Sequence, residues 1–301
     1  MIRKPSLALN RAHLALWLGA AAGLAGCGGG GGDSAAANKP PTAAARLVGE
    51  AVLNAATVFD VTGTVDTDGT IVTRSWNYGD GQTGTVDNHV YATTGAFTAT
   101  YTVTDNQGAT AAATVAVTVA KCSGAGTAAA AVSVRTTVCV QTSRGEMVFE
   151  INSAQAPITA TNFMRYVDDG FFKGTLFHRV INGFVIQGGG FTTGLVAKPP
   201  TYLPIVLESN NGLQNLVYTL AMARTNAPDS ATSQFFINVV ANPGLNYNPG
   251  VPGANGYAVF GTVIAGTAVV DTIKGVATGV VNGNADVPLT DVVIQGAVRM
   301  P

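Results

Sequence analysis

Charged residues are scarce in this chain. They make up 11% of its 301 residues, whereas about a quarter is usual in soluble domains. The formal net charge is −1, and lysine and arginine form no cluster that could follow a phosphate backbone, which argues against nucleic acid as a partner. Glycine, alanine, threonine and valine are abundant instead. This composition favours β-rich envelope or secreted domains over a cytosolic helical protein.

Histidine and cysteine are scarce as well, with three residues of each. His13 lies in a segment with the pattern of a signal peptide, and His89 and His178 lie in different predicted domains, so we expect no zinc site. The sequence offers no cofactor motif either, and we expect no metal and no cofactor.

Long apolar runs are missing from the N-terminal segment. Its apolar part, residues 14–24, is too short to span a bilayer as a mature helix. Arg3, Lys4 and Arg11 precede this part, as in the positively charged region of a signal peptide. We therefore expect a targeting segment here.

The residues that follow, LAGC at 24–27, resemble a bacterial lipobox. The resemblance implies that residues 1–26 are cleaved off and that Cys27 takes up acyl chains, which together give stable anchoring. Gly28 after the cysteine implies the outer membrane by the habit of that family. The expected location is therefore the bacterial cell envelope, with a lipid anchor at Cys27. The alternative is an ordinary secretory signal with a coincidental cysteine.

Residues 27–42 are predicted to be a tether between the anchor and the folded part. A run of five glycines gives the segment no fixed backbone, and Pro40 and Pro41 stiffen its far end.

Residues 43–120 are predicted to form a β-sandwich. In residues 97–105 (FTATYTVTD) apolar side chains alternate strictly with threonines, and residues 113–119 repeat the pattern, which is typical of half-buried strands. Residues 76–81 (WNYGDG), followed by HVY at 89–91, resemble the polycystic-kidney-disease (PKD) module. The resemblance implies an immunoglobulin-like sandwich of the kind found in surface proteins, with a glycan or protein partner as a possibility.

Residues 121–136 are predicted to be a linker, with Cys122 near its start and Cys139 just beyond its end. Once Cys27 is acylated, two cysteines remain, which is an even number in an oxidising compartment. We expect a disulfide between Cys122 and Cys139. Two free thiols are the alternative.

The stretch 177–191 (FHRVINGFVIQGGGF) carries the strongest motif of the chain. It reads as two short strands separated by Asn182-Gly183, a strong turn signal. Such a hairpin places Arg179, Phe184 and Gln187 near one surface. A buried hairpin with one solvated arginine is the alternative.

This stretch resembles the signature of the cyclophilin-type peptidyl-prolyl cis-trans isomerases. Residues 220–224 (LAMAR) with 230–238 (SATSQFFIN), and residues 256–263 (GYAVFGTV), continue the resemblance in the family's order. It covers residues 137–301 and is closest to the bacterial periplasmic branch. It implies an eight-stranded antiparallel barrel capped by two helices, so the whole chain is expected to be mainly β.

The residue patterns of this part agree with that expectation. Pro157 opens a helical pattern that Gly170 ends. The predicted helices are 157–169 and 267–274, and the further predicted strands are 138–142, 146–151, 216–222, 234–239, 258–263 and 292–298.

The resemblance also implies a function and a site. The implied function is rotation of X-Pro bonds in proteins, which would assist folding in the cell envelope and makes proline-containing polypeptides the partners. Arg179 matches the family's catalytic arginine, with Phe184 and Gln187 beside it. Phe184, Met222, Phe236 and Leu245 are expected to line an apolar slot for the proline ring. The remaining residues expected to bind substrate are Ala223, Arg224, Gln234 and Tyr257.

Two positions depart from family members that bind cyclosporin tightly. Those members carry a tryptophan where this chain has Gly244, and often a histidine where it has Tyr257. We therefore expect weak cyclosporin binding. The alternative function is a lipid-anchored binding or adhesion protein that uses the groove, or the PKD-like module, without significant turnover.

Overall fold

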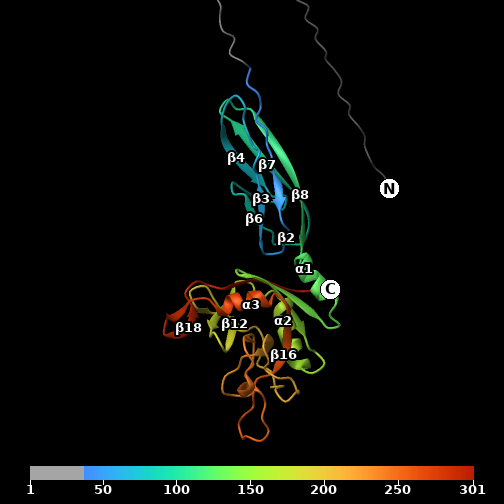
Figure 1. The fold of residues 1–301 in the computed structure, drawn as a ribbon, viewed down its shortest axis with the longest axis vertical. Coiled ribbons are helices and arrows are strands. Elements are labelled where there is room, and N and C mark those ends of the chain that lie inside the picture. The colour runs from blue at the N-terminus through green and yellow to red at the C-terminus, as the bar shows by residue number, and fades with distance from the viewer. Residues whose placement is uncertain (1–36) are drawn as a thin grey trace, which may run out of the picture. The chain divides into compact units, whose positions relative to one another are not determined.

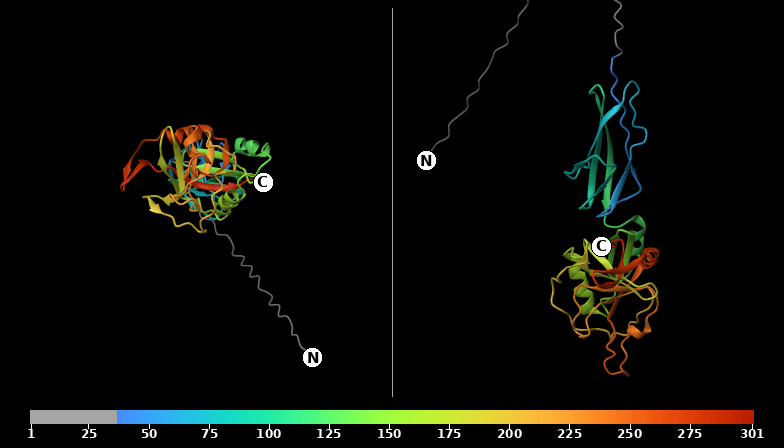
Figure 2. Two further views of the ribbon diagram at one scale, coloured as in Figure 1. Left: turned by 90° about the horizontal axis from the view of Figure 1, so that it is seen from below. Right: turned by 90° about the vertical axis from the view of Figure 1, so that its left-hand side faces the viewer.

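The computed structural model describes residues 37–301. The strands between residues 46 and 120 form two sheets, ordered β1-β3-β6 and β2-β8-β7-β4-β5 (Figure 1). The right-hand view of Figure 2 shows the same strands from the side. Their bounds are β1 (Arg46–Val48), β2 (Ala51–Val52), β3 (Ala56–Asp60), β4 (Ile71–Asn77), β5 (Thr83–Gly84), β6 (Asn88–Val90), β7 (Gly95–Asp105) and β8 (Thr110–Ala120).

The two sheets share an aromatic core. Trp76 on β4 is 1% exposed, and its ring centroid lies 4.5 Å from that of Phe59 on β3 and 4.9 Å from that of Tyr101 on β7. Its indole nitrogen donates a hydrogen bond to Asp87, so the one polar atom of the ring is satisfied. The alternation predicted for residues 97–105 is present, since Ala99, Tyr101 and Val103 are buried. The predicted β-sandwich is confirmed.

Residues 137–299 form a closed barrel. Eight antiparallel strands follow one another in the order β11-β19-β9-β10-β16-β14-β15-β12, and β12 pairs back with β11. The predicted eight-stranded barrel is confirmed. The bounds are β9 (Thr137–Thr142), β10 (Gly145–Ile151), β11 (Thr175–Val180), β12 (Val185–Thr192), β14 (Thr219–Met222), β15 (Phe235–Asn238), β16 (Val259–Ala265) and β19 (Val293–Arg299).

Smaller elements complete this part of the chain. Helices α2 (Pro157–Asp168) and α3 (Thr267–Lys274) lie where the sequence predicts them. Strand β13 (Val196–Ala197) extends the sheet beside β12. Strands β17 (Thr278–Val281) and β18 (Asn284–Pro288) form a separate hairpin, and η1 (Pro243–Leu245) is one turn of 3₁₀-helix. None of the helices within residues 37–301 is long and apolar enough to cross a membrane.

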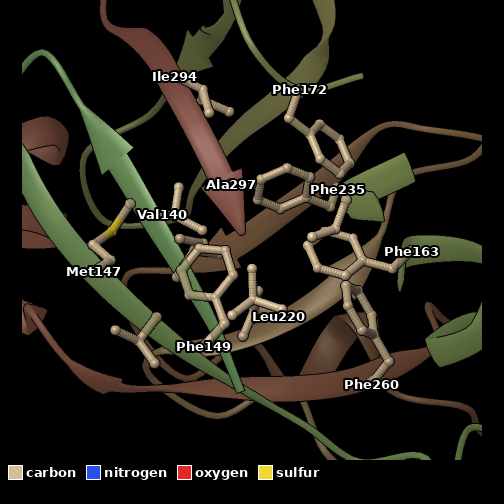
Figure 3. Close-up of a cluster of buried hydrophobic side chains, with 14 of the residues drawn as sticks. Val140, Met147, Phe149, Phe163, Phe172, Leu220, Phe235, Phe260, Ile294 and Ala297 are labelled. Atoms are coloured by element: carbon tan, nitrogen blue, oxygen red, sulfur yellow. The ribbon is translucent and has the colours of Figure 1, made fainter. Parts of the chain in front are cut away.

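Phenylalanine side chains fill the barrel (Figure 3). Phe163 of α2 is 1% exposed, and its ring lies 5.0 Å from Phe260, 5.2 Å from Phe172 and 5.5 Å from Phe235. Val270 and Ile273 of α3 are buried in the same cluster. Removing one such ring typically costs about 3–5 kcal/mol of folding free energy. The barrel is therefore a packed core, and any ligand site must lie on its outside.

One strand boundary was predicted wrongly, and the predicted linker has an element that the sequence did not indicate. Strand β14 begins at Thr219 rather than at Leu216, because Tyr218 has a φ of 63°, which interrupts extended backbone. The predicted linker 121–136 contains a helix, α1 (Gly124–Ala131). Ser123 caps its first turn, since its hydroxyl accepts a hydrogen bond from the amide of Gly126.

Cys122 and Cys139 are joined by a disulfide in the structure, with an S–S distance of 2.06 Å. Both are buried, in a small cluster with Val148 and Met300. The bond links the residue before the cap of α1 to β9 of the barrel. Cys27 and the predicted signal peptide lie outside the described residues, as does most of the predicted tether.

Candidate active site

Arg179 is held on the barrel by the hairpin of β11 and β12. The two strands pair antiparallel, with Arg179 opposite Gln187, and the turn between them contains Gly183 with a φ of 83°. A register shift between Phe177 and Arg179 breaks strict alternation. Phe177 and Val180 therefore both face the core, whereas the side chain of Arg179 is 38% exposed.

A cavity of about 180 Å³ lies beside Arg179, and most of the side chains that line it are apolar. We call it the apolar pocket. Its walls come from four segments: β11, β12 with the turn before it, β15 with the residues that follow β14, and η1 with the loop to β16. The lining residues are Arg179, Phe184, Val185, Gln187, Ala223, Arg224, Phe236, Leu245 and Tyr257.

Hydrogen bonds fix the walls of the apolar pocket. The amide of Asn242 donates to the backbone oxygen of Phe184 at 2.9 Å, and the amide N–H of Tyr257 donates to the backbone oxygen of Leu245 at 2.9 Å. The rings of Phe236 and Tyr257 meet edge to face, 5.5 Å apart. The pocket is therefore largely pre-formed, which reduces the entropy lost on binding.

Two glutamines form the polar side of the site. Arg179 Nη1 donates to Gln187 Oε1 over 3.5 Å, and Gln187 Nε2 donates to Gln234 Oε1 over 2.9 Å. A Cβ at Gly190 would lie 2.5 Å from the side chain of Gln234, so the glycine run at 188–190 leaves the space in which Gln234 sits. The chain Gln234–Gln187–Arg179 orients the guanidinium group.

Arg224 plays a different part from Arg179. Its Nε and Nη2 donate to the backbone oxygen of Gly256 at 3.0 and 2.8 Å, and its Nη1 donates to Thr225 O at 2.8 Å. Its guanidinium carbon lies 4.5 Å from the centre of the Tyr257 ring. The side chain of Arg224 therefore holds the loop that carries Tyr257, and Arg179 is the guanidinium with few hydrogen bonds.

The structure corrects one residue of the predicted site. Met222 does not line the apolar pocket; it is 2% exposed and lies in the core of the barrel. The reason is the period of two along β14: Leu220 and Met222 point inward, whereas Ala221 packs outside with Val185 and Phe236. Val185 lines the pocket and was missed. Gln234 lies next to the apolar pocket and lines a neighbouring cavity instead.

His178 is next to Arg179 in sequence but has no acid–base role in this geometry. Burial lowers its pKa from 6.5 to about 4, so the ring is uncharged at neutral pH. It packs against Phe191, with ring centroids 4.5 Å apart. These contacts describe a structural side chain.

A second, larger cavity of about 610 Å³ adjoins the first, and Arg179 and Gln187 line both. We call it the outer cavity. Gln234 and His178 lie on its barrel side, and Asn284 and Asp286 of the β17–β18 hairpin lie on the other. An arginine at the boundary of a small pocket with apolar side chains and a wider cavity of mixed lining can receive an extended chain with one apolar ring inserted.

A closed antiparallel barrel with this pocket on its outer face defines a cyclophilin fold. Residues 137–299, more than half of the chain, match the family described as cyclophilin type peptidyl-prolyl cis-trans isomerase. The chain belongs to this family, and this part of it is a peptidyl-prolyl cis-trans isomerase domain. Residues 38–119 match the PKD domain family.

Two bacterial relatives show how far the similarity extends. A peptidyl-prolyl cis-trans isomerase of Streptomyces antibioticus is 54% identical over 162 residues, which is 54% of this chain and 97% of the relative. Peptidyl-prolyl cis-trans isomerase B of Escherichia coli is 52% identical over 158 residues, which is 52% of this chain and 96% of the relative. Both similarities are therefore confined to about half of this chain.

Proposed function

We propose that the barrel isomerises X-Pro bonds in proteins of the bacterial cell envelope and that Arg179 lowers the barrier. One observation carries the assignment of Arg179: its guanidinium lies at the edge of the apolar pocket, and no carboxylate is among the residues that line this pocket. The guanidinium can therefore meet a substrate whose proline ring occupies the pocket, with its charge opposed by Asp286, whose Oδ2 lies 3.9 Å from Arg179 Nε.

The reaction needs a group that favours the twisted amide. Resonance gives the planar bond a rotation barrier of about 18–20 kcal/mol. When the bond twists, the prolyl nitrogen regains a lone pair and becomes a hydrogen-bond acceptor, which it is not in the planar state. A guanidinium N–H aimed at this nitrogen therefore stabilises the transition state more than the ground state. Arg179 supplies such a donor.

The apolar pocket supplies the binding energy for the proline ring. Phe184, Phe236 and Leu245 surround a space suited to three ring methylenes, whose burial is worth roughly 2 kcal/mol at ~0.8 kcal/mol each. Gln187 orients Arg179 and lies close enough to meet the substrate backbone. The backbone next to Ala223 would hold the flanking chain.

The lipobox-like sequence supports the envelope setting. Acylation of Cys27 would anchor the chain to a membrane, and the tether would separate the anchor from the PKD domain and the barrel. An isomerase held there would meet proline-containing proteins as they fold outside the cytoplasm.

A proline-isomerisation assay with the full chain tests the proposal. The chain should speed cis–trans exchange of an Ala-Pro peptide in proportion to its concentration. Exchange that stays at the uncatalysed rate would favour the alternative, a groove that binds proline-containing segments without turnover.

A further inference from the structure

The β17–β18 hairpin carries a carboxylate that no part of the proposed mechanism uses. Strand β18 packs beside β11, the strand of Arg179. Asp286 lies in the middle of β18 with a φ of 63°, a left-handed conformation that is uncommon for residues other than glycine. Aspartate adopts this conformation more readily than most side chains do, and here it places the carboxylate at the outer cavity.

Asp286 faces Arg179 across the outer cavity. Its Oδ2 lies 3.9 Å from Arg179 Nε, and the two side chains are 41% and 38% exposed. Among the residues that line the apolar pocket and the outer cavity, Asp286 is the sole carboxylate. The neighbouring His178 is uncharged, and the side chain of Arg224 is engaged by backbone oxygens of Gly256 and Thr225.

Two partners thus lie beside two different nitrogens of Arg179, one in an ion pair and one in a hydrogen bond. Asp286 lies next to Nε, and Gln187 accepts from Nη1 at 3.5 Å. A guanidinium is planar, so contacts at two of its nitrogens restrict both its position and its plane. Within residues 37–301, Gln187 accepts the one hydrogen bond that Arg179 donates, so both N–H groups of Nη2 and one of Nη1 are left for a substrate.

We propose that Asp286 is a positioning residue for the isomerase reaction: it holds the Arg179 guanidinium in the plane that directs its remaining N–H groups to the prolyl nitrogen. The inference rests on the proposed role of Arg179. Because the hydrogen bond to the prolyl nitrogen forms only in the twisted state, a guanidinium that samples more orientations lowers kcat more than it weakens substrate binding.

The test is a kinetic comparison of full-length variants on an Ala-Pro peptide, with kcat and KM measured separately. Asp286→Asn keeps the size of the side chain and tolerates the left-handed backbone, but it removes the charge. It should lower kcat about three- to tenfold and leave KM within twofold. Asp286→Glu, which restores the charge, should regain at least half of the lost kcat. Asp291→Asn, in the segment that follows β18, is the matched control and should behave as wild type.

A double-mutant cycle with Arg179→Lys separates positioning from direct contact with the substrate. Lysine lacks Nε and the planar fork, so Asp286→Asn should change kcat less than twofold in the Arg179→Lys background. The same fold loss in both backgrounds would overturn the inference, as would an effect on KM alone or wild-type kcat in Asp286→Asn. If Arg179→Ala itself keeps wild-type activity, the proposed function fails. If Arg179→Ala is impaired and Asp286→Asn is not, only this inference fails.

Discussion

Replacing Gly244 with tryptophan should create tight cyclosporin binding. Gly244 precedes Leu245, a wall of the apolar pocket, and the resemblance implies that it stands where family members that bind the drug tightly carry a tryptophan. No heavy atom lies within 4 Å of the position that a Cβ would take at Gly244, and its φ is not in the left-handed range. A large side chain therefore fits without moving the backbone.

The expected gain follows from the area that the new ring would cover. Tryptophan can bury about 200 Å², and contact with a ligand over half of this area removes roughly 100 Å² from water. At ~25 cal/mol per Å², this is worth about 2.5 kcal/mol, close to a hundredfold in affinity.

Calorimetric titration of the purified full chain with cyclosporin measures this gain. Gly244→Trp should bind about a hundredfold more tightly than wild type, and Gly244→Ala, the control for loss of glycine, should not. An affinity of Gly244→Trp within threefold of wild type would refute the reasoning, and so would nanomolar binding by the wild-type chain.

Three further predictions concern other parts of the chain. Cys27→Ser should abolish acyl labelling in cells, and normal labelling of this variant would rule out the anchor. The Cys122–Cys139 bond closes a loop with a sequence separation of 17, so the Cys122→Ala/Cys139→Ala double variant should lose about 3 kcal/mol of unfolding free energy, measured in urea. Thiol alkylation without reductant should leave both wild-type cysteines unmodified. Recovery of both as alkylated thiols would contradict the bond. Burial holds the pKa of His178 at about 4 in the folded chain, below its usual 6.5; the stability that its neutral ring contributes is therefore complete above pH 6.5 and is lost as pH falls toward 4. His178→Gln should reduce the pH dependence of unfolding in that range, and wild-type kcat/KM should show no step near pH 6.5.

Patterns that are local in sequence predicted most of the fold. The hairpin around Asn182-Gly183 and the helix that begins at Pro157 depend on neighbouring residues, and both form as predicted. The alternation along residues 97–105 identified half-buried strands for the same reason, because side chains on a strand change face at every residue.

Features that depend on distant contacts could not be predicted in this way. Whether Met222 or Val185 lines the apolar pocket depends on which face of each strand meets the barrel core. The motifs that contain these residues do not show which face that is. Nothing in residues 278–288 distinguishes Asp286 from a solvated turn residue. Its position beside Arg179 follows from the packing of β18 on β11, which no local pattern records.

Arg179→Ala tests the central claim most directly. The measurements are kcat/KM on an Ala-Pro peptide and a thermal melt, with Arg144→Ala, at an exposed position of the same barrel, as the control. Loss of one transition-state donor typically costs about 2.7–4 kcal/mol, so Arg179→Ala should lose two to three decades of kcat/KM. The variant should still fold normally, and Arg179→Lys should regain little of the lost activity. Wild-type kcat/KM in a folded Arg179→Ala would contradict the account.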